Sequence, residues 1–159
     1  MPSHMRALWG LGLLCTLGLA TAHARSATGY DHGAKKTIEL VRIGGAEVEA
    51  STARAFRTMA RAAAKAGIDL SIRSGFRSME LQKELYREYQ HGWGNLAARP
   101  GFSNHQSGRA LDIYITDYRV YEWLTKHAAK FGFKRTVRRE AWHWEFTGGE
   151  ERLARRGRR

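Results

Sequence analysis

The sequence predicts a single compact α+β domain with a small, largely antiparallel sheet and about three helices. Three observations indicate this class. The chain has 159 residues, which leaves room for one domain and little more. No repeat, low-complexity linker or change of composition interrupts residues 37–146. Short strand-like segments are mixed there with helical ones, without the regular strand–helix–strand rhythm of a parallel sheet.

Residues 1–24 have the pattern of a secretory signal. A short basic start, Met1–Arg6, precedes an apolar run over Ala7–Ala20, and residues 22–24 supply the small residues before a signal-peptidase cut. The run is well short of the ~20 residues of a membrane span, so no transmembrane anchor is expected after cleavage. The expected divisions are a signal peptide over 1–24, a mobile N-terminal segment over 25–36, the folded domain over 37–149 and a basic tail over 150–159.

The charge balance points to an anionic environment. The formal net charge is +12, and the single cysteine, Cys15, falls in the expected signal peptide. We therefore expect an exported monomer without disulfides in the periplasm or the extracellular cell-wall space, with anionic envelope polymers as possible partners of its basic surface and tail. Export and the absence of a nucleic-acid motif argue against nucleic-acid binding.

The first half of the domain reads as a strand, a helix and a second strand. Thr37–Ile43 alternates as a strand does, and two glycines follow. Ser51 or Thr52 can cap a helix that stops at Gly67. The residues expected on its core face are Ala55, Met59, Ala62 and Ala63. Asp69–Arg73 is the second strand.

The second half supplies two helices and two strands. Ser78 can cap the first of these helices, and a glycine-punctuated loop over 91–100 follows it. The residues expected to point inward from that helix are Leu81, Leu85 and Tyr89. The remaining elements are a strand over Ala110–Ile115, a helix over Tyr121–Lys130 and a strand over Trp142–Phe146.

One carboxylate, Asp112, interrupts the apolar strand Ala110–Ile115. Because side chains alternate, Asp112 lies on the face opposite Leu111, and we expect that face to look into a cleft. His105 precedes Asp112 by an odd number of residues and cannot share its face on a straight strand. A bend at Gly108 could re-aim the imidazole. The two side chains can converge, although their spacing does not require it.

The last strand carries a second histidine. His143 alternates with aromatic residues, and Glu140 lies three residues earlier, where a turn could bring its carboxylate near the imidazole. A catalytic zinc site needs about three protein ligands, an open position and a nearby base that is not a ligand. His105, Asp112 and His143 with Glu140 supply that inventory. Taken singly, each residue also fits an ordinary surface or ion-pair role.

Three motifs carry a family resemblance. The stretches "SNHQSGRALDI" and "EAWHWEF" resemble the Ser-x-His, Gly-x-Ala-x-Asp and Glu-x-Trp-His signatures of the VanY type of zinc D-alanyl-D-alanine carboxypeptidases, peptidase family M15. "SGFRS", Ser74–Ser78, is similar to the third motif of that family and lies upstream in the expected order. The resemblance covers about Leu70–Phe146, and the three motifs are jointly specific.

The resemblance implies a compact α+β domain with one Zn²⁺ in a cleft, acting on peptidoglycan stem peptides. It implies that the zinc ligands are His105, Asp112 and His143, that Glu140 is the general base, that Arg77 holds the substrate or stabilises the oxyanion, and that Gln82 and Ser103 line the pocket for the terminal D-residue. The expected reaction is removal of terminal D-alanine by Glu-assisted attack of zinc-bound water.

Two alternatives stay open at this point. An endopeptidase or dipeptidase of the same superfamily would cut another bond of the stem peptide with the same chemistry. A non-catalytic cell-wall binding module would keep the fold and use its basic surface. The sequence also does not decide which of Arg73, Arg77 and Arg109 faces the pocket.

Overall fold

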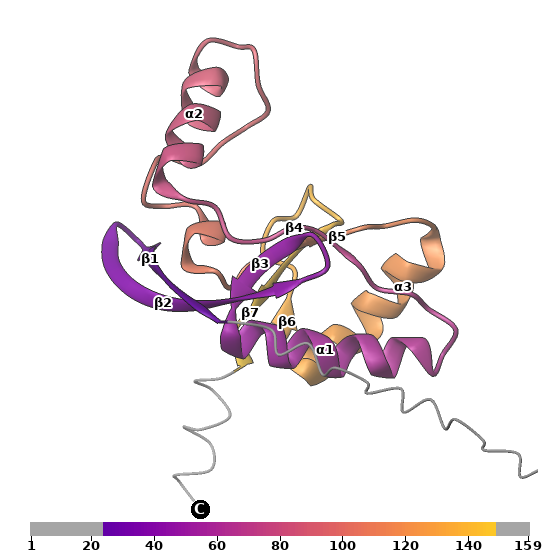
Figure 1. Cartoon of the computed structure of the whole chain (residues 1–159). Helices are drawn as coiled ribbons and strands as arrows, with labels where there is room; N and C mark the ends of the chain where they lie inside the picture. The colour runs from indigo at the N-terminus through magenta and orange to yellow at the C-terminus, as the bar shows by residue number, and fades with distance from the viewer. Residues whose placement is uncertain (1–23, 149–159) are drawn as a thin grey trace, which may run out of the picture.

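The computed structural model describes residues 24–148, so the expected tail and nearly all of the expected signal peptide lie outside the described residues. The elements, in chain order, are β1 (Arg25–Asp31), β2 (Ala34–Ile43), β3 (Ala46–Glu49), α1 (Ala50–Ala64), β4 (Ile72–Ser74), α2 (Met79–Gln90), the 3-10 turn η1 (Asn104–Ser107), β5 (Ala110–Ile113), α3 (Tyr118–His127), the 3-10 turn η2 (Ala128–Phe131), β6 (Phe133–Lys134) and β7 (His143–Phe146). The α+β class with three helices is confirmed (Figure 1). No helix within 24–148 has the length and apolar character needed to cross a membrane.

The strands form two antiparallel sheets where one was expected. The first has the order β1-β2-β3 and the second the order β4-β5-β7-β6. Two backbone hydrogen bonds join the two sheets. The amide of Phe76 donates to the Glu47 carbonyl at 2.6 Å, and the amide of Glu49 donates to the Gly108 carbonyl at 2.9 Å.

Residues 25–36 are not a mobile segment, and that expectation is wrong. They form β1 and the start of β2, paired in continuous register from Arg25 opposite Leu40 to Asp31 opposite Ala34. The two-residue turn between them, His32 and Gly33, has positive φ at both positions, 49° and 84°. This is the backbone that suits the twist of a hairpin. The folded domain therefore includes β1.

The hydrophobic core lies between α1, α3 and the second sheet. Phe56 and Met59 of α1, Leu124 of α3 and Leu111 of β5 belong to one buried cluster. Trp144 is also part of it, with 3% of its surface exposed. The helix α1 begins one residue after Glu49, which is its N-cap in place of the expected Ser51 or Thr52.

The helix α2 stands out from the body of the molecule (Figure 1). Ser78 caps it as expected, its Oγ accepting from the amide of Leu81 at 3.2 Å. Leu81 and Tyr89 do not point inward, since they are 44% and 40% exposed. The hydrophobic periodicity is present, but the only residue that this helix buries is Gln82. The expectation of an apolar core face on α2 is therefore wrong.

Candidate metal centre

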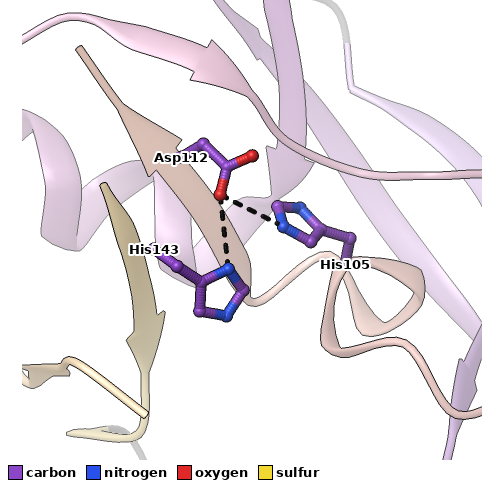
Figure 2. A group of neighbouring side chains, drawn as sticks. All are labelled: His105, Asp112 and His143. Atoms are coloured by element: carbon purple, nitrogen blue, oxygen red, sulfur yellow. Dashed lines mark hydrogen bonds and ion pairs between the residues drawn. The ribbon is translucent and has the colours of Figure 1, made fainter. Parts of the chain in front are cut away.

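Three side chains that are distant in sequence meet in one buried group (Figure 2). His105, Asp112 and His143 each offer one ligand atom, and these atoms all lie within 4.8 Å of one another. His105 Nε2 lies 3.4 Å from Asp112 Oδ1, and His143 Nδ1 lies 3.3 Å from the same oxygen. Each of the three residues is at most 4% exposed. The convergence that the spacing allowed is therefore present.

Strand pairing and one left-handed residue explain the convergence. Asp112 on β5 lies directly opposite His143 on β7, so both side chains leave the same face of the sheet. His105 is in η1, which ends at Gly108 with φ of 73°. A Cβ at Gly108 would lie 3.0 Å from the backbone nitrogen of Glu49. Glycine is thus required by both conformation and space, and the bend that it permits turns the His105 ring toward Asp112.

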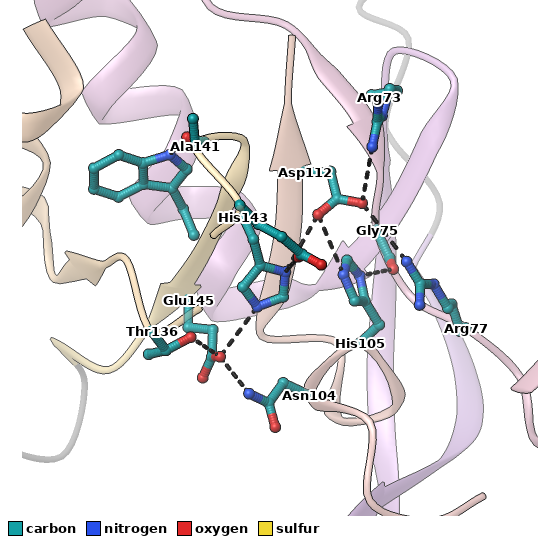
Figure 3. Close-up of polar contacts among 12 residues, drawn as sticks. Arg73, Gly75, Arg77, Asn104, His105, Asp112, Thr136, Ala141, His143 and Glu145 are labelled. Carbon is teal, nitrogen blue, oxygen red and sulfur yellow. Dashed lines mark hydrogen bonds and ion pairs between the residues drawn. The ribbon is translucent and has the colours of Figure 1, made fainter. Parts of the chain in front are cut away.

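Hydrogen bonds fix which nitrogen of each imidazole faces the group. His105 Nδ1 lies 2.7 Å from the Gly75 carbonyl oxygen, and His143 Nε2 lies 3.1 Å from Glu145 Oε1 (Figure 3). Both partners are acceptors, so these nitrogens donate. His105 Nε2 and His143 Nδ1 are left facing the carboxylate. Two imidazole nitrogens and one carboxylate oxygen, with outer hydrogen bonds to orient the rings, fit a catalytic zinc ion.

Without a metal, Asp112 and His143 shift each other's pKa values. Burial opposes the ionisation of Asp112, but hydrogen bonds and charge from the two histidines outweigh it and hold the Asp112 pKa well below its usual range. Burial also opposes the charging of His143. Hydrogen bonds to Asp112 and Glu145, with their charges, outweigh that effect and raise the pKa of His143 to about 9. At neutral pH the metal-free His143 therefore holds an additional proton.

Zinc uptake is expected to displace that proton, because only the neutral imidazole can bind the metal. Below about pH 9 the apparent zinc affinity should rise by about tenfold per pH unit, and it should level off above the His143 pKa. Titration against a zinc buffer across this range measures the slope. A zinc affinity that does not change between neutral pH and pH 9 would contradict the assignment of His143.

Glu140 lies beside the three side chains and outside their cluster. Its Oε2 is 3.8 Å from His143 Nδ1, and its side chain is 33% exposed. The turn before β7 places it, since the Glu140 carbonyl accepts from the amide of His143 at 3.4 Å. Glu140 is thus close enough to the group to exchange a proton with a water there, as the general-base prediction requires.

Two arginines approach the other oxygen of Asp112. Arg77 Nη2 is 3.6 Å and Arg73 Nη2 is 3.8 Å from Asp112 Oδ2 (Figure 3). The Arg77 side chain is 24% exposed and that of Arg73 is 49% exposed, so Arg77 is the inner of the two. Arg109 lines a separate cavity beside Asn104 and Glu145. The arginines that face the metal group are therefore Arg73 and Arg77.

The two residues predicted to line the substrate pocket have other contacts. Gln82 is fully buried and its Nε2 donates to the Ala98 carbonyl at 2.8 Å, which ties α2 to the following loop. Among buried side-chain atoms of residues 24–148, Gln82 Oε1 alone has no hydrogen-bond partner. Ser103 is the N-cap of η1 and lines the cavity next to Arg109. Their substrate-binding role stays a prediction.

The role of Glu145 was not predicted from the sequence. Its carboxylate accepts a hydrogen bond from His143 Nε2, the ring nitrogen that does not face Asp112. Besides the imidazole, Glu145 Oε1 accepts from Asn104 Nδ2 and Thr136 Oγ1 (Figure 3). Burial opposes its ionisation, but hydrogen bonds from His143, Thr136 and Asn104 keep its pKa below the usual value. The signal was present in the sequence, because Glu145 is two residues from His143 and so shares its strand face.

Replacing Glu145 by alanine is expected to weaken zinc binding by about 10–100-fold, because His143 loses the hydrogen bond that orients its ring. Glu145→Gln should lose less, since an amide oxygen still accepts from Nε2. Competition with a chromophoric chelator measures the affinity. Glu122→Gln, in an exposed ion pair of α3 with Lys126, is the matched control. Zinc affinities equal to that of the unaltered protein would show that the contact plays no part in metal binding.

Comparison with known proteins decides the family. The family model described as "VanY: D-alanyl-D-alanine carboxypeptidase" matches residues 45–149. The chain belongs to the VanY family. The resemblance carried by the three motifs is confirmed.

Two curated relatives come from Bacillus subtilis (strain 168). The peptidoglycan L-alanyl-D-glutamate endopeptidase CwlK is 47% identical over 56 residues, which cover 34% of this chain and 34% of CwlK. The putative carboxypeptidase YodJ is 29% identical over 127 residues, which cover 64% of this chain and 46% of YodJ. The chain thus matches a third to a half of the length of these two relatives.

Solved structures of VanY enzymes and of an L,D-carboxypeptidase share the fold. One of them is a mutant of the vancomycin resistance D,D-pentapeptidase VanY from the VanB-type cassette, in complex with Zn(II). It is 26% identical to this chain with a TM-score of 0.61, and the match covers 74% of this chain and 83% of the VanY chain. VanYB in complex with D-alanine-D-alanine has the same identity and TM-score and covers 76% and 84%. The L,D-carboxypeptidase DacB from Streptococcus pneumoniae is 25% identical, has a TM-score of 0.55 and covers 85% and 92%. The donor set of His105, Asp112 and His143 in this chain fits a zinc ion.

Proposed function

We propose that this VanY-family protein is an exported zinc peptidase that removes the terminal D-alanine from peptidoglycan stem peptides. The observation that carries the proposal is the buried group of His105, Asp112 and His143 with Glu140 beside it. The family match and the VanYB complex with D-alanine-D-alanine support the substrate class.

Each residue has a distinct task in this proposal. His105, Asp112 and His143 hold the zinc ion, which when bound acidifies a water molecule and polarises the scissile carbonyl. Glu140 accepts the proton of the attacking water and passes it to the leaving amine. Both proton transfers need a carboxylate that lies next to the zinc ligands but is not itself a ligand. The 3.8 Å between Glu140 Oε2 and His143 Nδ1 is consistent with that position.

Arg77 stabilises the charge that develops on the former carbonyl oxygen. Its guanidinium is largely covered and faces the metal group from the side of Asp112 Oδ2. A cation in such a place acts with little competition from water, and its charge persists because an arginine guanidinium stays protonated at all ordinary pH values.

A second candidate is an endopeptidase that cuts within the stem peptide. The identity of 47% to an L-alanyl-D-glutamate endopeptidase over 56 residues favours it. The same residues would perform the same steps on a different bond, so only the depth of the substrate pocket would differ.

Product masses separate the two candidates. The zinc-loaded chain from Arg25 onward is incubated with a stem pentapeptide ending in D-alanyl-D-alanine, with and without chelator. Loss of one alanine, only when zinc is present, is the expected result. Cleavage between L-alanine and D-glutamate would select the endopeptidase, and an intact peptide with zinc present would reject both.

A further inference from the structure

Two arginines face a single carboxylate oxygen of the metal group. Arg73 and Arg77 both point Nη2 at Asp112 Oδ2, while Asp112 Oδ1 faces the two imidazoles (Figure 3). One carboxylate cannot balance two guanidinium groups and a zinc ion. Even with Glu140 and Glu145 nearby, the zinc-loaded group stays net positive. The site therefore attracts an additional anion.

The donors of Arg73 are available for that anion. Its distance of 3.8 Å to Asp112 Oδ2 is too long for a hydrogen bond, and no hydrogen bond from its guanidinium is found within residues 24–148. An ion pair that is half exposed contributes little to stability, because water screens it. The ion pair with Asp112 therefore does not explain why an arginine stands at position 73.

The Arg73 guanidinium lies over an aromatic ring. Its carbon Cζ lies 5.4 Å from the centroid of Trp142, which is next to the metal ligand His143 in the chain. Such a cation–π contact limits the positions that the guanidinium takes, and a guanidinium can bind a carboxylate through two parallel hydrogen bonds. Arg73 thus lies at the outer side of the metal group, and Arg77 lies deeper.

We propose that Arg73 selects substrates in which the amino acid released as the leaving group carries a free carboxylate on its α-carbon. This inference rests on the proposed peptidase function and names the residue that recognises this carboxylate. Two bonds of a stem peptide present that chemistry. A terminal D-alanine carries its carboxylate there, and so does a D-glutamate that is linked onward through its side chain. A leaving residue whose carboxylate is an amide does not.

The test compares acid and amide forms of each substrate. The zinc-loaded protein is assayed on a peptide ending in D-alanyl-D-alanine and on its C-terminal amide, and on an L-alanyl-D-glutamate peptide and its D-isoglutamine form. The unaltered protein is expected to favour the acid of the bond that it cuts by about tenfold in kcat/KM, mainly through KM. Arg73→Gln should remove that preference by slowing the acid alone, and Arg73→Lys should restore part of it because the charge returns.

Arg135→Gln is the matched control. Arg135 lies over Tyr121 at 5.5 Å from the ring centroid, so its replacement removes the same charge and the same kind of ring contact elsewhere. The acid preference should be unchanged in this variant. Equal slowing of acid and amide by Arg73→Gln, or no effect on either, would overturn the inference.

A binding measurement separates this inference from the proposed function. Calorimetry with the zinc-loaded protein compares the affinities of the acid and amide peptides whether or not either is cut. If D-alanine is not released but the acid still binds more tightly than the amide through Arg73, the inference stands and the D-alanine specificity fails. If acid and amide bind equally well in the unaltered protein, the inference fails whatever bond is cut.

Discussion

Replacing Glu140 by glutamine is expected to lower kcat by at least about 10²–10⁴-fold while zinc stays bound. An amide has nearly the shape of the carboxylate but cannot accept a proton from the attacking water. The metal should remain because Glu140 lies beside the His105–Asp112–His143 group and is not one of the three side chains that face one another. Steady-state kinetics and metal analysis on the same sample measure both quantities.

Glu122→Gln serves as the control for this change as well, because it removes one carboxylate from an exposed ion pair on α3. A Glu140→Gln variant that keeps full activity with zinc bound would exclude Glu140 as the base. A protein whose cell-wall binding is unchanged by the substitution, and which releases no product in either form, would instead support the binding-module alternative.

Replacing Asp112 by asparagine is expected to abolish zinc binding and activity together and to destabilise the metal-free protein. Asn keeps the volume but removes the negative charge on which His143, Arg73 and Arg77 converge. Asp112 and His143 are both buried, and removing one partner of a buried ion pair costs ~3–5 kcal/mol because the remaining charge loses its compensation. Metal analysis and thermal unfolding in chelator measure the two effects.

Asp117→Asn is the matched control for Asp112→Asn. Asp117 is the exposed N-cap of α3 and accepts from the amides of Arg119 and Val120. Asparagine caps a helix about as well as aspartate does, so stability and zinc content should both change little. An Asp112→Asn variant with a full complement of zinc would show that the metal is held elsewhere.

The sequence could place two of the three side chains of the metal group, Asp112 and His143, but not His105. Alternation along β5 correctly separates Asp112 from the core residue Leu111, and alternation along β7 correctly turns His143 away from Trp144. Spacing could not place His105, since an odd separation needs a bend. That bend depends on the left-handed Gly108 and on its close approach to Glu49, a contact between two sheets that local pattern does not contain.

Other features depended on contacts that a linear pattern does not show. The strand β1 and the first three residues of β2, Ala34–Lys36, are mostly polar and exposed or half-buried, so they lack the apolar alternation by which Thr37–Ile43 is recognised. The turn between β1 and β2, at His32 and Gly33, was the only local signal. The helix α2 has helical periodicity but no partner sheet, so the periodicity predicted a buried face that the fold does not provide.

The central claim is that one zinc ion, held by His105, Asp112 and His143, is required for release of D-alanine. The most direct measurement is zinc content per chain, followed in one sample through chelation and stepwise zinc return, with D-alanine release assayed at each step. We expect one zinc per chain, loss of release when it is removed, and recovery in proportion to the zinc restored. Release that persists in the metal-free protein, or zinc bound in full by a chain lacking these three side chains, would contradict the claim.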